Sequence, residues 1–308
     1  MRIVYMGTPE FAVPSLQALL DAGHEVAAVF TQPDKPKGRK QILTPSPVKV
    51  LAQERGIPVF QPVTLRTPEA EKLLWELAPD LVAVAAYGKI LPKAILELPK
   101  YGCVNVHASL LPKYRGAAPI QWAVINGEEK AGVTTMQMAE GIDTGDMLLS
   151  VSTPIDPEEN AEELTARLAQ LGASLLVKTL EGLQSGSIVP VKQDDAKSCY
   201  VSMLSRELSP VDWSRTAKEI HNRIRGLYPW PAVETFCEGK RLKLFRSRPV
   251  AGRPGLPGTV SVSGGKFTVC CGEGTALELL EVQPENGKRM NGGDFLRGHP
   301  AIDGTMLK

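Results

Sequence analysis

Apolar and polar positions in the first half of the chain follow two alternating patterns, one typical of buried strands and one of amphipathic helices. Residues 81–87 form a nearly continuous apolar run, the pattern of a central strand covered on both faces. The spacing of apolar residues predicts a long amphipathic helix at 160–183. The same criteria predict strands at 2–7, 25–31, 104–107 and 132–138, and helices at 9–22 and 68–77. Strands that alternate with helices predict a parallel sheet with helices on both faces.

The pattern changes after residue 186. Residues 187–205 lack a clear period, and one helix is predicted within 209–227. Short strand-like runs separated by Gly and Pro turns then follow at 232–237, 241–245, 258–262, 267–271 and 276–282. About five short strands in roughly 75 residues predict a small barrel, most simply an OB-like one.

Composition is that of a soluble globular protein. The chain has 308 residues, of which 43% are hydrophobic and 22% charged. It has no apolar run of about 18 residues and no signal-peptide pattern at its start, so we expect neither a membrane span nor export. Its five cysteines are odd in number and show no Cys-x-x-Cys spacing. We therefore expect reduced thiols and a cytoplasmic location, without a disulfide framework or a zinc site.

Charge is divided unevenly along the chain. Residues 206–308 contain 16 lysines and arginines against 11 aspartates and glutamates, although the net charge of the whole chain is only +1. A mildly acidic body joined to a basic C-terminal part favours contact between that part and a polyanion. Ordinary scatter of charge is the alternative.

An amide and an imidazole end the predicted strand at 104–107. Asn105 and His107 are two residues apart, so a strand would point both side chains to the same face. Such a pair can stabilise a carbonyl oxygen that is becoming an oxyanion. Asp143, in a loop after the strand at 132–138, could orient the imidazole. A half-buried structural histidine and an aspartate in an ordinary turn are the alternative interpretation.

A Gly- and Pro-containing loop follows this strand and carries a specific resemblance. Asn105-Val-His107 followed by Ser109-Leu-Leu-Pro112-Lys-Tyr-Arg115-Gly116 resembles the signature of folate-dependent formyltransferases. Three more stretches resemble the branch of that family that acts on methionyl-tRNA: Thr31-Gln-Pro-Asp34-Lys-Pro-Lys-Gly38-Arg39, Ala117-Ala-Pro-Ile-Gln-Trp122 and Ile224-Arg225-Gly-Leu-Tyr-Pro229-Trp230-Pro231.

The resemblance, which runs over essentially the whole chain, implies a fold and an activity. The fold would be α/β, with a Rossmann-like formyltransferase domain at 1–188, a linker at 189–205 and an OB-like, tRNA-binding β-barrel domain at 206–308. The activity would transfer the formyl group of 10-formyltetrahydrofolate to methionine carried by initiator tRNA. No metal would be required, and a monomer is the expected state.

Site residues follow from the same resemblance. The family's catalytic Asn, His and Asp correspond to Asn105, His107 and Asp143. Its folate-binding positions correspond to Ser109, Leu110, Leu111, Pro112 and Gly116, with the pterin near Tyr87, Gly88 and Leu91.

Two groups of basic residues are candidates for tRNA contact. The loop at 32–47 carries Lys35, Lys37, Arg39 and Lys40, and the resemblance places such a loop in the acceptor stem of tRNA. Where the family has Gly-Arg-Gly-Lys, this chain has Gly38-Arg39-Lys40-Gln41, and the missing second glycine would stiffen the loop. In the C-terminal part the candidates are Arg223, Arg225 and Lys243. A solvated basic surface is the alternative for both groups.

Two other functions stay open at this stage. A folate-dependent formyltransferase acting on a small amine would share the site at residues 105–119 but would not need the basic C-terminal part. A non-catalytic tRNA-binding protein on a degenerate transferase fold would not need Asn105, His107 and Asp143 together.

Overall fold

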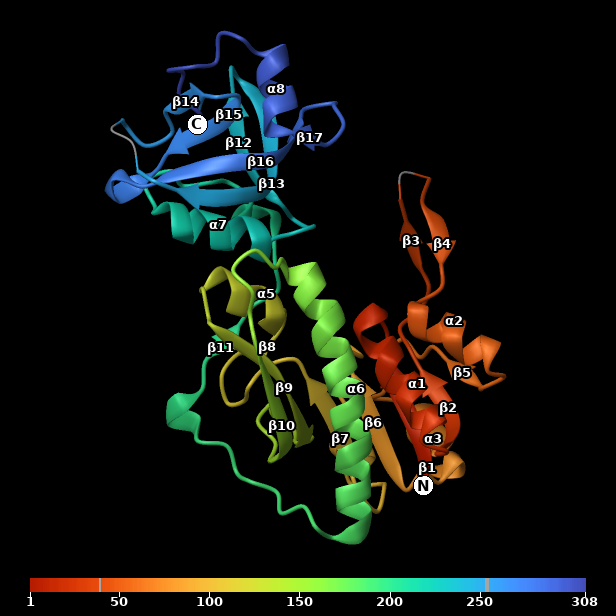
Figure 1. Ribbon diagram of the computed structural model, residues 1–308. Helices are drawn as coiled ribbons and strands as arrows, with labels where there is room; N and C mark the ends of the chain where they lie inside the picture. Colours follow the sequence, from red (N-terminus) through yellow and green to blue (C-terminus); the bar gives the residue numbers. More distant parts are fainter. Residues whose placement is uncertain (39, 253–254) are drawn as a thin grey trace. The chain divides into compact units, whose positions relative to one another are not determined.

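A seven-stranded, mostly parallel sheet dominates the first part of the chain in Figure 1, a computed structural model that describes residues 1–38, 40–252 and 255–308. The chain divides into two compact units. The first comprises Met1–Gly116, Ala131–Thr153 and Thr165–Tyr200, and the second comprises Ala117–Lys130, Pro154–Leu164 and Val201–Lys308. Two segments from within the first 188 residues thus belong to the second unit.

The sheet of the first unit has the strand order β10-β9-β7-β6-β1-β2-β5. Its strands are β1 (Arg2–Gly7), β2 (Glu25–Phe30), β5 (Val59–Phe60), β6 (Leu81–Ala85), β7 (Cys103–His107), β9 (Lys130–Gln137) and β10 (Met147–Pro154). The α-helices of this unit are α1 (Val13–Asp21), α2 (Pro47–Glu54), α3 (Pro68–Leu77), α4 (Lys93–Leu96) and, from Thr165 onward, α6 (Ala161–Ser185). Shorter elements are η1 (Glu10–Ala12), β3 (Lys35–Lys37), β4 (Ile42–Thr44), β8 (Arg115–Gly116), η2 (Asp195–Lys197) and the start of β11 (Tyr200–Val201).

Buried side chains cover both faces of this sheet. Val4 and Met6 of β1 belong to one apolar cluster with Leu74 of α3. Helix α6 lies on the sheet at Gly172, where an added Cβ would come within 2.8 Å of the Val106 side chain. The predicted central strand, now β6, is buried along its whole length.

Strand β9 departs from the parallel arrangement. It pairs with β7 in the antiparallel sense, with Val104 opposite Gln137 and His107 opposite Thr134. The carboxyl end of β9 therefore lies beside the start of β7, away from His107. The alternation of strands and helices predicted a parallel sheet and could not indicate this reversal, which the connection through 108–130 determines.

The second unit is built on an antiparallel sheet, as predicted for the C-terminal part. Its strand order is β12-β13-β16-β15-β14, and β17 pairs with β16. The strands are β12 (Val233–Cys237), β13 (Lys240–Val250), β14 (Val260–Ser263), β15 (Lys266–Cys270), β16 (Ala276–Pro284) and β17 (Met290–Asn291). The helical elements are α5 (Pro119–Ile125), η3 (Arg206–Leu208), α7 (Ala217–Gly226), η4 (Gly272–Gly274) and α8 (Gly292–Gly298).

The C-terminal residues join the two edges of this sheet. Lys308 exchanges two backbone hydrogen bonds with Phe236 of β12, and Thr305 accepts one from Val260 of β14. Edge strands expose unpaired backbone groups, and this last segment satisfies them on both sides, so the sheet closes into a small barrel.

Helix α7 lies within the range 209–227 in which one helix was predicted. It starts at Ala217. A capping box fixes this start: the Thr216 hydroxyl accepts from Glu219 N and the Glu219 carboxylate accepts from Thr216 N. An N-cap of this kind stabilises a helix start by about 1 kcal/mol.

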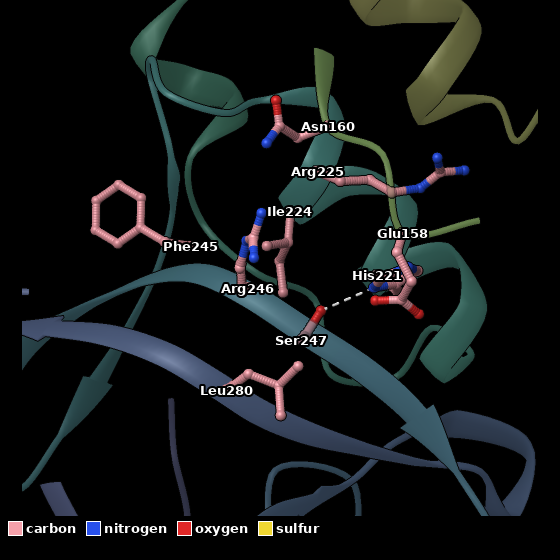
Figure 2. Close-up of a pocket in the computed structure, with 9 residues that line it drawn as sticks. All are labelled: Glu158, Asn160, His221, Ile224, Arg225, Phe245, Arg246, Ser247 and Leu280. Carbon is pink, nitrogen blue, oxygen red and sulfur yellow. Dashed lines mark hydrogen bonds between the residues drawn. The ribbon is translucent and has the colours of Figure 1, made fainter. Parts of the chain in front are cut away.

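His221 is buried on α7 with both ring nitrogens bonded. Its Nε2 lies 2.9 Å from the carbonyl oxygen of Pro157, and its Nδ1 lies 3.0 Å from the hydroxyl of Ser247 (Figure 2). Because a carbonyl only accepts, Nε2 carries the proton of the neutral ring and the Ser247 hydroxyl donates to Nδ1. Burial lowers the pKa of His221.

Among the helices that the structure describes, none combines the length and the apolar character that a bilayer span requires.

Acid should destabilise the fold through His221. The unfolded chain takes up a proton at its ordinary pKa of about 6.5, while the folded chain resists it. Stability should therefore fall as pH decreases from 7 through that range, and His221→Gln should make the fall shallower, although His24, whose pKa burial also lowers, keeps part of it. Urea unfolding between pH 8 and 5 measures this, and equal slopes for both proteins would exclude His221.

Candidate active site

Strand β7 presents Asn105 and His107 on one face, as the two-residue period requires. His107, the last residue of the strand, is 6% exposed. Asn105 is half-buried, and its side-chain amide has no hydrogen-bond partner within the described part of the chain. The amide is therefore able to donate to a bound molecule without breaking an existing bond.

The imidazole of His107 is held by two groups from other segments. Its Nε2 lies 2.9 Å from the carbonyl oxygen of Tyr114, and its Nδ1 lies 3.6 Å from Oδ2 of Asp143. The Tyr114 carbonyl can only accept, so Nε2 carries a proton and Nδ1 is the nitrogen that faces the carboxylate. The structure thus brings together the histidine and the aspartate that the sequence analysis paired.

Asp143 lies in the turn between β9 and β10 in a left-handed backbone conformation, with φ of 53°. For a residue other than glycine this conformation costs about 1 kcal/mol, so the surroundings must hold it. One such contact is made to Asp143 itself: the backbone N–H of Gly116 donates to Oδ2 of Asp143 at 2.8 Å. The carboxylate is thereby fixed between Gly116 and His107.

The predicted folate loop is tied to the neighbouring strand β9. The hydroxyl of Thr134 donates to the carbonyl of Ser109 at 2.7 Å and accepts from the backbone N–H of Leu111 at 3.1 Å. Leu111 is buried, while Leu110 and Pro112 are half-buried. The loop is thus anchored through its backbone.

The end of β6 forms a second border of this region. Tyr87 is 1% exposed, and its hydroxyl has no hydrogen-bond partner in the described residues. Burial raises the pKa of Tyr87 to about 12. Gly88 is exposed with φ of 74°, and a Cβ there would meet the Gln32 side-chain nitrogen at 2.5 Å. Leu91 is buried in the same apolar cluster as Tyr87.

The predicted tRNA loop forms a β-hairpin. Strands β3 and β4 pair in the antiparallel sense, and Lys35, Lys37 and Lys40 are exposed on it. Arg39 lies outside the described residues. At the hairpin base, Lys49 donates to the Asp34 carboxylate at 2.7 Å, and this bond lowers the pKa of Asp34.

The three cations predicted in the second unit have different surroundings. Arg225 is 7% exposed, and its guanidinium donates to the carbonyls of Asp156 and Glu159, each at 3.1 Å, and to the side chain of Asn222. Arg225 is one of the residues that line a small pocket of about 100 Å³, and Figure 2 labels it with the others. The guanidinium donors are used inside the unit, and the contact of Arg225 with tRNA stays a prediction.

Arg223 and Lys243 keep part of their surface. Arg223 is half-buried and donates to the carbonyl of Leu208 at 2.6 Å, and burial lowers its pKa. Lys243 lies half-buried on β13. Basic residues that are neighbours in sequence therefore do not form one exposed face.

Sequence analysis missed two residues that surround the Asp143 turn. Gln193, from the segment predicted to be a linker, is 6% exposed, and Arg115, from the signature loop, is 2% exposed. A buried side chain in a segment without a period leaves no pattern, so only the packing could reveal Gln193. Arg115 stood in a recognised motif, but its partners lie about 80 positions away.

Within the described residues there is no group of three or more His, Cys, Asp or Glu side chains that could hold a metal ion.

Comparison with known proteins identifies the family of the chain. The formyl transferase family model matches residues 1–180, and the model of the formyl transferase C-terminal domain matches residues 203–300. Methionyl-tRNA formyltransferase of Geotalea uraniireducens is 52% identical over 307 residues, which cover 100% of this chain and 98% of the relative. The enzyme of the same name from Citrifermentans bemidjiense is 53% identical, over 100% of this chain and 96% of the relative.

Among solved structures, a crystal structure of WlaRD, a sugar 3N-formyl transferase studied in the presence of dTDP and 5-N-formyl-THF, superposes with a TM-score of 0.68. It is 22% identical, with 94% of this chain and 99% of that chain covered, and so supports the fold alone. The identity over the full length is decisive: the chain belongs to the methionyl-tRNA formyltransferase family.

Proposed function

We propose that this protein transfers the formyl group of 10-formyltetrahydrofolate to the α-amino group of methionine esterified to initiator tRNA. The observation that carries the proposal is the His107–Asp143 pair beside the free amide of Asn105, in a chain 52% identical to methionyl-tRNA formyltransferase over its full length. The cytoplasm, where aminoacylated tRNA is used, is the compartment in which we expect the reaction.

Direct attack of the amine accounts for the residues at the site. The nitrogen lone pair of methionine forms a bond to the formyl carbon, and the carbonyl π electrons move to oxygen. Asn105 donates a hydrogen bond to this oxyanion, and His107, with a proton on both ring nitrogens, donates to it through Nδ1–H. Each well-placed donor is worth about 3–4 kcal/mol in comparable sites. The carbonyl then re-forms as the C–N10 bond breaks, and N10 of the folate leaves with the proton that Asp143 took from the amine.

Asp143 handles the proton in this proposal. The attacking amine becomes positively charged as it adds, so a base must take one of its protons. The Asp143 carboxylate is 16% exposed and lies beside His107, which lets it receive the proton directly or through water. The hydrogen bond that it accepts from the backbone N–H of Gly116 keeps the carboxylate in place during the transfer.

Backbone groups of the signature loop are proposed to hold the folate. Ser109, Leu110, Leu111, Pro112 and Gly116 would contact it on one side, and Tyr87, Gly88 and Leu91 on the pterin side. Support comes from the Thr134 anchor, which fixes the loop, and from WlaRD, whose structure was determined in the presence of 5-N-formyl-THF. A preformed backbone loses little entropy when a planar ligand binds.

The hairpin is the proposed tRNA contact of the first unit. Lys35, Lys37 and Lys40 are exposed there and could reach phosphates, with Ile42 and Leu43, 62% and 67% exposed, beside them. We place Arg39 in the same set from its sequence position. In the second unit, Arg223, Arg225 and Lys243 stay in the proposed set.

Formyl transfer to tRNA tests the proposal directly. We expect the purified chain, given 10-formyltetrahydrofolate, to formylate methionyl initiator tRNA and to leave a dTDP-linked amino sugar unchanged. Product can be followed by hydrolysing the ester and separating formylmethionine from methionine. Transfer to the amino sugar alone would indicate the small-amine function, and binding of tRNA without transfer to either would indicate a non-catalytic protein.

His107→Ala should lower kcat by about 10²–10³, because it removes one oxyanion donor. The variant should still fold, with a somewhat lower unfolding midpoint because the Tyr114 carbonyl loses its hydrogen-bond partner. His299→Ala, a histidine of the second unit outside the site, is the matched control and should keep near-normal kcat. A His107→Ala enzyme that turns over normally would remove this residue from the catalytic set.

Replacing Lys35, Lys37 and Lys40 together by Ala should raise the KM for tRNA about tenfold without changing the KM for folate. The dependence of tRNA affinity on salt should also become shallower, by about 0.7–0.9 in log–log slope for each lost phosphate contact. Lys72→Ala with Lys93→Ala, exposed lysines of α3 and α4, serves as control. An unchanged slope would contradict the role given to the hairpin.

A further inference from the structure

Residues 187–205, the segment without a clear period, include one buried side chain, that of Gln193, which contacts the Asp143 turn. The Nε2 group of Gln193 donates to the carbonyl of Asp143 at 2.8 Å and to the carbonyl of Gly145 at 2.7 Å. A primary amide has two N–H groups, so both are used on this single turn. The contact is specific for an amide donor with two protons.

Arg115 holds Gln193 in this orientation. Its Nε donates to Oε1 of Gln193 at 3.0 Å, which leaves the amide nitrogen on the side of the Asp143 turn. Its other nitrogens donate to the Asp195 carboxylate at 2.8 Å and to the Tyr200 hydroxyl at 3.2 Å. The guanidinium is only 2% exposed and Gln193 is 6% exposed, so the bond between them is shielded from water, whereas the Asp195 side chain is 80% exposed.

The same part of the chain also holds the carboxylate. Gly116, the residue after Arg115, donates its backbone N–H to Oδ2 of Asp143. The pair Arg115–Gly116 therefore fixes Asp143 twice, directly at its carboxylate and through Gln193 at its backbone. The remaining contact of the carboxylate is with Nδ1 of His107.

The turn needs such support because of where β9 ends. The strand stops at Gln137 beside Val104, and the chain must return toward His107, which is opposite Thr134. Asp143 is also in the left-handed backbone region, and a Cβ at Gly145 would come within 1.7 Å of the Gln137 carbonyl oxygen. A strained, returning loop keeps one conformation only where its surroundings fix it.

We infer that Gln193, oriented by Arg115, is a positioning residue for formyl transfer, setting the distance between the Asp143 carboxylate and the imidazole of His107. This inference rests on the proposed function. Gln193 bonds to the carbonyls of the turn and to Arg115, and to neither the His107 nor the Asp143 side chain. Its loss should therefore reduce kcat and leave the KM values for folate and tRNA nearly unchanged.

Two substitutions separate donation from packing. Gln193→Leu removes all its hydrogen bonds, whereas Gln193→Glu keeps an acceptor for Arg115 but turns carboxylate oxygens toward the two carbonyls. We expect both to lower kcat by about 10–100-fold, the usual effect of displacing a reacting group by about 1 Å. Gln170→Leu, at an exposed glutamine of α6, is the matched control and should keep normal kcat.

A double-mutant cycle with Asp143→Ala gives the decisive readout. If Gln193 acts through Asp143, adding Gln193→Leu to Asp143→Ala should change kcat less than twofold, because the group it positions is already gone. A full additional loss in the double variant would overturn the inference. So would a normal kcat in folded Gln193→Leu, or an effect confined to KM.

Other outcomes keep the two proposals apart. If Gln193→Leu fails to fold, Gln193→Glu replaces it in the double-mutant cycle with Asp143→Ala. A normal kcat for Gln193→Glu would then overturn the inference. If the unsubstituted protein transfers no formyl group to methionyl initiator tRNA, the proposed function fails. If the unsubstituted protein is active and the Gln193 variants have the same kcat, only the positioning role of Gln193 is refuted.

Discussion

The contact between Nδ1 of His107 and Oδ2 of Asp143, at 3.6 Å, is the constraint on which the rest of the site depends. One partner sits at the end of a rigid buried strand, and the other sits on a turn with an unfavourable backbone conformation. Because β9 runs antiparallel to β7, the end of β9 lies away from His107. The short separation therefore requires bonds that draw the turn back, which Gly116 and Gln193 provide.

Strand β7 and the loop that follows it each position a different part of the site. The strand fixes Asn105 and His107 relative to each other by its two-residue period, at no cost beyond forming the sheet. The loop at 108–116 adds what the strand cannot supply: the Tyr114 carbonyl that orients the ring and the Gly116 amide that holds the carboxylate. Thr134 ties that loop to β9, so a single strand supports both the loop and the turn.

Basic side chains are used in two different ways in this protein. Arg225 and Arg115 are among the most deeply buried cationic side chains, and both donate hydrogen bonds to oxygen atoms of the protein. The lysines of the hairpin are exposed, so they could meet phosphates without first losing internal bonds. Counting basic residues along the sequence overstates the surface available for nucleic acid, because guanidinium groups also serve as internal hydrogen-bond donors.

Local sequence determined the strand carrying Asn105 and His107, the bounds of helix α3 (Pro68–Leu77), and the change from α/β to antiparallel β after residue 186. These features follow from hydrophobic period and capping residues, which act over a few positions. Only the tertiary structure decided the reversal of β9, the closing of the barrel by residues 305–308, the burial of Arg225 and the placement of Gln193 behind Asp143. Each joins residues tens of positions apart through single hydrogen bonds or strand pairings, and such contacts leave no periodic trace in the chain.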